Sequence, residues 1–369
     1  MSQAACPARK TACIVPVLLL LSLLLTGCPG KRAAQFDEPA VSGKRNGVAV
    51  LLTGAAARIP QEAALLEELD RRGLLNDLVF LSGVSSGALN SVMFNGIRSG
   101  RMSWEEYRNI LFSLKDSDIY LRQGKKLPVN TAPARKLYQR VVEERLGYRA
   151  IGDLPLVTAI SITHLQDLDL KRTVYRMCSR KINEESDPSL NLVDVLMASS
   201  SFPVVFPPVT IGNPSTIPDV EYVDGGVGID HVPYRALLEF EKYRGAGVER
   251  VYIISRKSDS LPEVSEELRG LGIDDKGIFD RLGISLDAIL YRGLVTRLEA
   301  YAAEAPELVP RTWVWIPDFQ EDFLLFNFEN LREQYELTYR WAGTNNPVPL
   351  EDFLIRCRKK QDLSDTTAP

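Results

Sequence analysis

The feature that most constrains the fold is the pentapeptide Gly83-Val84-Ser85-Ser86-Gly87, which lies where an apolar run ends and a helical pattern begins. Residues 78–81 are typical of a strand buried on both faces, and residues 86–94 are typical of a helix. A GxSxG sequence at such a junction predicts a sharp turn that projects the serine hydroxyl away from a sheet. The two glycines let backbone and helix approach closely. The alternative is a glycine-rich turn with a surface serine.

The same alternation of patterns occurs earlier in the chain. Residues 47–53 form a continuous apolar run, and Pro60 begins a helical stretch that Gly73 ends. Strand, helix, strand and helix in this order predict an α/β fold with a mostly parallel central sheet.

Later segments carry weaker patterns. We expect helical structure over 103–146, a pair of strands at 156–163 and 172–177, and a short helix over 192–199. The five prolines of 203–220 predict a loop. We also expect a helix over 233–243, a strand over 251–255, helices over 276–305 and 329–342, and a frayed tail beyond Asn345.

The first residues have the pattern of a secretory signal. Arg9 and Lys10 precede an uncharged apolar run over 14–25, which is too short for a helix to span a bilayer core of about 30 Å. The run ends in Leu25-Thr26-Gly27-Cys28, which resembles the bacterial lipobox. That resemblance implies cleavage before Cys28, lipid attachment there, and a place in the bacterial cell envelope, on the outer membrane or the outer face of the inner membrane. An ordinary signal or a buried apolar helix is the alternative.

These patterns divide the chain into a signal peptide (1–27), a lipid-anchored tether (28–46), a folded domain (47–345) and a C-terminal tail (346–369). The composition, with 45% apolar and 25% charged residues, excludes a mostly disordered or fibrous chain. A formal net charge of −4 without a basic block argues against a nucleic-acid partner. The chain has no CxxC or HExxH sequence, which argues against a zinc site. A disulfide between Cys178 and Cys357 is permitted outside the cytoplasm but not required.

A nucleophilic serine needs a base, and the chain has only two histidines, His164 and His231. The order Ser85, Asp224, His231 matches the order of nucleophile, acid and histidine in α/β-hydrolases. A Ser-His-Asp hydrolase that uses His231 therefore stays open. Asp224 and His231 are close in sequence, so such a triad would need a tight loop.

Four stretches together resemble the patatin-like phospholipase family. They are the GxSxG sequence, the segment from Ala198-Ser199-Ser200-Ser201-Phe202-Pro203 to Phe206-Pro207-Pro208, the segment Tyr222-Val223-Asp224-Gly225-Gly226-Val227, and the N-terminal Leu52-Thr53-Gly54-Ala55-Ala56-Ala57-Arg58. The resemblance is strongest over 47–235 and only loose over 240–345. It implies a three-layer α/β sandwich and a serine acyl hydrolase of phospholipase, lysophospholipase or esterase type, which the lipid expected at Cys28 would anchor to a membrane.

The resemblance also implies roles for single residues. Ser85 is the nucleophile and Asp224 is its proton acceptor, without a histidine, and an acyl-enzyme forms on Ser85. Gly225 and Gly226 would let the backbone turn so that the carboxylate faces the serine. The oxyanion would be held by the backbone N–H groups of Gly54, Ala55, Ala56 and Ser86. The reaction needs no metal and no cofactor, and membrane lipid is both the substrate and the anchoring surface.

The oxyanion loop departs from the family pattern GGGx[RK]G. Only Gly54 and Arg58 match, and Ala55 and Ala56 replace two glycines. Alanine keeps its N–H but is strained by about 1–2 kcal/mol where φ must be positive. Arg58 is expected to brace the loop or to face a lipid phosphate, with a surface ion pair as the alternative. A lipid-binding envelope lipoprotein with weakened catalysis is therefore the second hypothesis for function.

Overall fold

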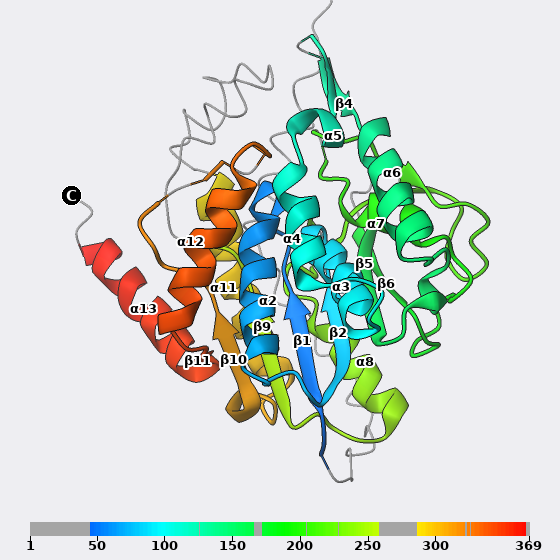
Figure 1. Cartoon of the computed structure of the whole chain (residues 1–369). Helices are drawn as coiled ribbons and strands as arrows, with labels where there is room; N and C mark the ends of the chain where they lie inside the picture. The colour runs from blue at the N-terminus through cyan, green and yellow to red at the C-terminus, as the bar shows by residue number, and fades with distance from the viewer. Residues whose placement is uncertain are drawn as a thin grey trace, which may run out of the picture. The chain divides into compact units, whose positions relative to one another are not determined.

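The computed structural model describes residues 45–366 apart from 125, 166–171, 204, 228, 258–285, 322 and 325. The expected signal peptide, Cys28 and nearly all of the expected tether lie outside the described residues. A mixed sheet forms the centre of the fold (Figure 1). Its middle strands are parallel and lie in the order β10 (Thr312–Trp315), β9 (Arg250–Ile254), β1 (Val48–Leu52), β2 (Leu78–Gly83) and β5 (Val157–Leu165).

Antiparallel strands extend this sheet on both sides. At one side β11 (Val348–Pro349) pairs with β10. At the other, β5 pairs with both β6 (Arg172–Cys178) and β8 (Glu221–Asp224), and β7 (Val209–Thr210) follows β8. The expected strand pair is therefore confirmed as β5 and β6.

Side chains of β1 alternate between the two faces of the sheet, as the period of a strand requires. Val50 and Leu52 pack in one apolar cluster with α2 (Ile59–Arg71), α3 (Ser86–Arg98) and α12 (Leu331–Thr344). Ala49 and Leu51 pack in a second cluster with α8 (Tyr234–Arg244), α11 (Leu286–Glu304) and α13 (Leu350–Thr366). Figure 1 shows α2 and α3 crossing the near face of the sheet. The predicted three-layer α/β sandwich is confirmed.

The region from 103 to 146 differs from the helical expectation. It contains α4 (Trp104–Ser113), α5 (Asp116–Ile119), the antiparallel hairpin of β3 (Leu121–Gln123) and β4 (Lys126–Asn130), α6 (Ala132–Tyr138) and a π-helical stretch, η2 (Gln139–Arg145). The expectation is wrong for the hairpin, because Pro128 lies within β4 and its missing N–H does not support a helix interior. Short 3₁₀ turns are η1 (Ala56–Arg58), η3 (Ile151–Asp153), η4 (Gly225–Val227) and η5 (Val309–Arg311).

The segment after Asn345 is folded, so the expectation of a frayed tail is wrong. Its β11 extends the sheet, and Leu350, Leu354 and Cys357 of α13 are buried against the domain. These residues recur at helical spacing, which gives α13 one apolar side. Cys357 and Cys178 are both buried. The expected short helix is confirmed as α7 (Leu192–Ser199). Within the described part of the chain, no helix is both long enough and apolar enough to cross a membrane.

Candidate active site

Two strands meet end to end on one edge of β5. Strand β2 runs parallel to β5 and its last residue, Gly83, pairs with Ile160. Strand β8 runs antiparallel and its last residue, Asp224, pairs with Ile162. Since β6 occupies the opposite edge along this part of β5, β2 and β8 share an edge and their ends are separated by about 7 Å, the rise of two strand residues. This topology brings the GxSxG turn to Asp224 across 139 residues of sequence.

Ser85 sits at a strained turn between β2 and α3. Its backbone has φ 55° and ψ −127°, a conformation that is rare for a residue with a side chain. The glycines on either side permit close approach, as expected. A Cβ on Gly83 would lie 2.4 Å from the carbonyl oxygen of Gly87, and one on Gly87 would lie 2.5 Å from that of Leu52. Ser85 remains partly exposed at the start of α3.

The carboxyl group of Asp224 is buried beside this serine. Its Oδ1 accepts a hydrogen bond of 2.8 Å from the N–H of Gly226, and the Ser85 side chain lies close enough to act on its charge. Removal from water raises the pKa of Asp224 to about 7, although the neighbouring Ser85 side chain and the Gly226 N–H oppose the rise. Gly225 packs tightly on β5, since a Cβ there would lie 2.4 Å from the Ser161 carbonyl oxygen. The structure thus brings Ser85, Asp224, Gly225 and Gly226 together.

The N-terminal loop also reaches the serine. A Cβ on Gly54 would lie 2.9 Å from the Cβ of Ser85. Ala56 has φ 45°, so alanine occupies a left-handed position that glycine would adopt without strain. Within the described part of the chain, the N–H groups of Gly54, Ala56 and Ser86 donate no hydrogen bond.

Ala55 differs from the other expected oxyanion donors. Its N–H donates to the Oγ of Ser86 at 2.7 Å, so this donor is engaged within the protein. The reason is that Ser86 supplies a hydroxyl directly beneath the loop. Ala55 itself has φ −135° and needs no left-handed conformation. The role of the Ala55 N–H toward an oxyanion stays a prediction, which requires that this bond to Ser86 be exchanged for one to the oxyanion.

Arg58 braces the loop from within. It is 1% exposed, and it donates from Nε to the carbonyl of Phe323 at 2.7 Å and from a terminal nitrogen to that of Lys257 at 2.9 Å. Of the expectations for Arg58, the structure favours loop bracing over a surface ion pair.

His231 is buried close to Gly226 but takes no part in the contacts of Ser85 or Asp224. Burial, with the positive charges of Arg256 and Arg297, lowers the pKa of His231 to about 3. Its Nε2 has no hydrogen-bond partner among the described residues. The neighbouring Asp230 pairs with Arg176 at 2.7 Å. The arrangement does not support a Ser-His-Asp triad.

Sequence reasoning assigned no role to Ser199, although it lies in a recognised motif. The N–H of Ser85 donates to Ser199 Oγ at 2.9 Å, and Ser199 Oγ donates to the carbonyl of Ser161 at 2.8 Å. Ser161 lies between the two β5 residues that pair with Gly83 and Asp224. These hydrogen bonds fix the serine turn to β5, the strand with which Asp224 also pairs. No local pattern in the sequence reveals such a contact.

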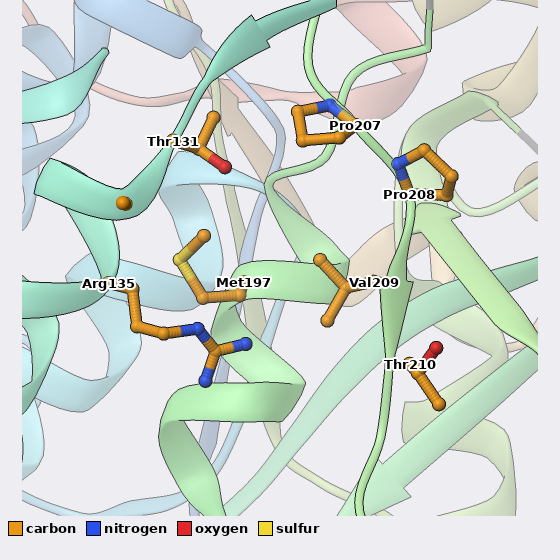
Figure 2. A pocket seen from close by; sticks show the side chains of 8 residues that line it. Thr131, Arg135, Met197, Pro207, Pro208, Val209 and Thr210 are labelled. Carbon is orange, nitrogen blue, oxygen red and sulfur yellow. The ribbon is translucent and has the colours of Figure 1, made fainter. Parts of the chain in front are cut away.

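A separate pocket of about 320 Å³ lies beside α6 and α7, and neither Ser85 nor Asp224 lines it. Figure 2 shows Met197 between Arg135 and Val209 in this pocket. The guanidinium of Arg135 pairs with Asp194 at 2.5 Å. Among the described residues, no group of three or more His, Cys, Asp or Glu side chains is arranged to hold a metal.

Comparison with known proteins gives one matching family model and several similar solved structures. Residues 50–238 match the family model for the patatin-like phospholipase. Similar solved structures include VipD from Legionella pneumophila, with 11% identity over 88% of this chain and 73% of that one, at a TM-score of 0.34. The human GIVD cytosolic phospholipase A2 has 11% identity over 69% of this chain and 50% of that one, at a TM-score of 0.38.

The type III effector protein ExoU has 11% identity over 85% of this chain and 54% of that one, at a TM-score of 0.38. This chain therefore spans only about half the length of the human phospholipase A2 and of ExoU. No curated protein sequence matches the chain.

Proposed function

This chain belongs to the patatin-like phospholipase family and is a hydrolase of lipid esters, and from that premise we propose that it works through a Ser85–Asp224 dyad on membrane lipid. The observation that carries the proposal is that Ser85 lies beside the buried carboxyl group of Asp224, at the ends of two strands that share an edge of β5. A base with a pKa of about 7 is well matched to accept a proton near neutral pH.

The proposed reaction has two halves. Asp224 accepts the hydroxyl proton of Ser85 as Oγ attacks the ester carbonyl carbon. The resulting tetrahedral oxyanion collapses, the ester C–O bond breaks, and Asp224 returns the proton to the leaving alcohol. Water then loses a proton to Asp224 and attacks the acyl carbon. The bond between that carbon and Ser85 Oγ breaks, the fatty acid leaves, and Asp224 returns its proton to Oγ, which restores Ser85.

The oxyanion is assigned to the N–H of Ser86 at the start of α3, with the N–H groups of Gly54 and Ala56 as further donors. The positive end of the α3 dipole favours negative charge at that point. The engaged N–H of Ala55 and the strain at Ala56 favour the second candidate, a lipid-binding envelope protein with weak catalysis. That candidate predicts vesicle binding without turnover.

Anchoring at Cys28 is proposed from the sequence alone. Cleavage before Cys28 and acylation would place the hydrolase on a membrane of the bacterial envelope, where dual acylation holds a protein stably. Mass spectrometry of the mature amino terminus tests this directly. A diacylglyceryl-modified Cys28 supports the anchor, and a mature protein with an unmodified cysteine contradicts it.

The dyad is tested by hydrolysis of a short-chain nitrophenyl ester and of phosphatidylcholine vesicles. Ser85→Ala and Asp224→Asn should each lower kcat by at least about 100-fold, the usual size of a nucleophile or base effect. Exposed residues supply matched controls, Ser113→Ala and Asp219→Asn, which should retain wild-type turnover. Turnover that survives in Ser85→Ala would refute the proposal.

A further inference from the structure

Glu62 is a fully buried acid on the apolar side of α2 that the proposed mechanism does not use. It lies one helical turn before Leu66, which packs in the core between α2 and the sheet. An acid in such an apolar stripe is costly unless hydrogen bonds compensate it. The role of Glu62 therefore depends on the hydrogen bonds that its carboxyl group accepts.

The carboxyl group connects three elements that meet at Ser85. Thr53, at the end of β1, donates to Oε1 at 3.1 Å. Ser86 and Asn90 of α3 donate to Oε2 at 3.4 Å and 3.3 Å. The Ser86 hydroxyl in turn accepts the N–H of Ala55 at 2.7 Å. A continuous chain of hydrogen bonds therefore runs from Glu62 through Ser86 into the loop beside the serine.

We propose that Glu62 is a positioning residue that sets the conformation of the loop at 54–56 through the Ser86 hydroxyl. The inference rests on the proposed function of that loop in holding the oxyanion. With the Ala55 N–H tied to Ser86, the loop adopts one conformation in which Ala56 has φ 45° and Gly54 lies against Ser85. This explains how a loop with alanines in place of two glycines keeps a defined shape.

The network is sensitive to pH on its alkaline side. Burial raises the pKa of Glu62 to about 8, and its hydrogen bonds and the charge of Arg256 oppose the rise. The groups that face it are Arg256, which also donates to the Gly54 carbonyl at 3.2 Å, and Tyr107, whose hydroxyl donates to Asn90 at 2.5 Å. Glu62 is therefore neutral near pH 7. Its ionisation above pH 8 would draw the Arg256 guanidinium and the Ser86 hydroxyl toward the carboxylate and disturb the loop.

The experiment compares Glu62→Gln, Glu62→Ala and Ser86→Ala in the full chain, with kcat and KM for the nitrophenyl ester measured from pH 6 to 10. Glu62→Gln should keep kcat at pH 7 and lose the fall in kcat above pH 8. Glu62→Ala and Ser86→Ala should lower kcat about 10-fold or more, within the range for a disturbed oxyanion site, with little change in KM. Glu67→Gln is the matched control, because Glu67 is a second buried acid on α2 that bonds to Arg108 instead. It should leave the profile unchanged.

Amide hydrogen exchange over residues 52–58 supplies a readout that does not need turnover. Exchange at Ala55 should be faster in Glu62→Ala and Ser86→Ala than in the wild type, but not in Glu62→Gln or Glu67→Gln. Equal exchange in all variants, or an alkaline fall in kcat that persists in Glu62→Gln, overturns the inference. A wild-type protein without turnover would overturn the proposed function instead, and the exchange result would still decide the role of Glu62.

Discussion

Gly83 and Asp224 end two different strands and lie two residues apart along one edge of β5, opposite Ile160 and Ile162. Strand β2 runs parallel to β5 and β8 runs antiparallel to it, so the backbone leaves the sheet at nearly the same place after each of the two strands. Ser85 follows the first end by two residues, and its side chain meets the carboxyl group of the second.

Catalysis should be lost as the pH falls through about 7. Because burial raises the pKa of Asp224 to about 7, the carboxyl group is protonated below that pH and cannot accept the proton of Ser85. With an uncharged ester, kcat/KM should fall about tenfold per pH unit below the pKa, as for a single required base. A profile that stays flat down to pH 5 would contradict the role of Asp224.

Gly54→Ala should disable the site without unfolding the domain. The added Cβ would lie 2.9 Å from the Cβ of Ser85, so the loop or the serine must shift, and a displacement of about 1 Å can cost about 10²-fold in rate. Gly343→Ala is the control, because that position has open space around it. Steady-state kinetics with both variants, and unchanged far-UV circular dichroism, check this prediction. Wild-type kcat/KM in Gly54→Ala would contradict it.

Ala56→Gly should stabilise the protein. The φ of 45° at Ala56 strains an alanine, and glycine should raise the free energy of unfolding by about 0.5–1 kcal/mol. Ala55→Gly is the matched change at φ −135°, where glycine brings only added chain entropy and should destabilise by a similar amount. Urea unfolding of the two variants distinguishes them, and equal shifts would argue against strain at Ala56.

His231→Gln should leave turnover nearly unchanged. A catalytic base contributes about 10²–10⁴-fold in rate, whereas His231 has no bond to Ser85 or Asp224 among the described contacts. The kcat of the folded variant, checked by its thermal midpoint, should stay within a factor of about ten of wild type. A loss of 100-fold would restore the Ser-His-Asp hypothesis.

The parts of this site that were predictable from sequence depend on local chemistry. The turn at Ser85 could be predicted because two glycines and a serine follow a buried strand, and α2 could be predicted from its apolar spacing. The pairing of Asp224 with Ile162 depends on contacts between distant segments, and only the family resemblance indicated that Asp224 belongs with Ser85.

Two further features, the docked C-terminal helix and the buried acid on α2, have a visible pattern in the sequence, although neither is among the expectations stated above. The apolar spacing of Leu350, Leu354 and Cys357 is visible in the sequence and predicts a docked helix. Glu62 interrupts the apolar side of α2, which marks it as a buried acid. The bond from Ala55 to Ser86 could not be predicted, because it depends on how a loop and a helix 31 residues apart in sequence pack together.

The most direct test of the dyad is the rate at which a fluorophosphonate probe labels Ser85, followed by intact mass and peptide mapping. We predict one adduct on Ser85 in the wild type, none in Ser85→Ala, and a labelling rate at least about 100-fold lower in Asp224→Asn, because the base that activates the serine is gone. Labelling of Asp224→Asn at the wild-type rate, or an adduct on another residue, would contradict the account.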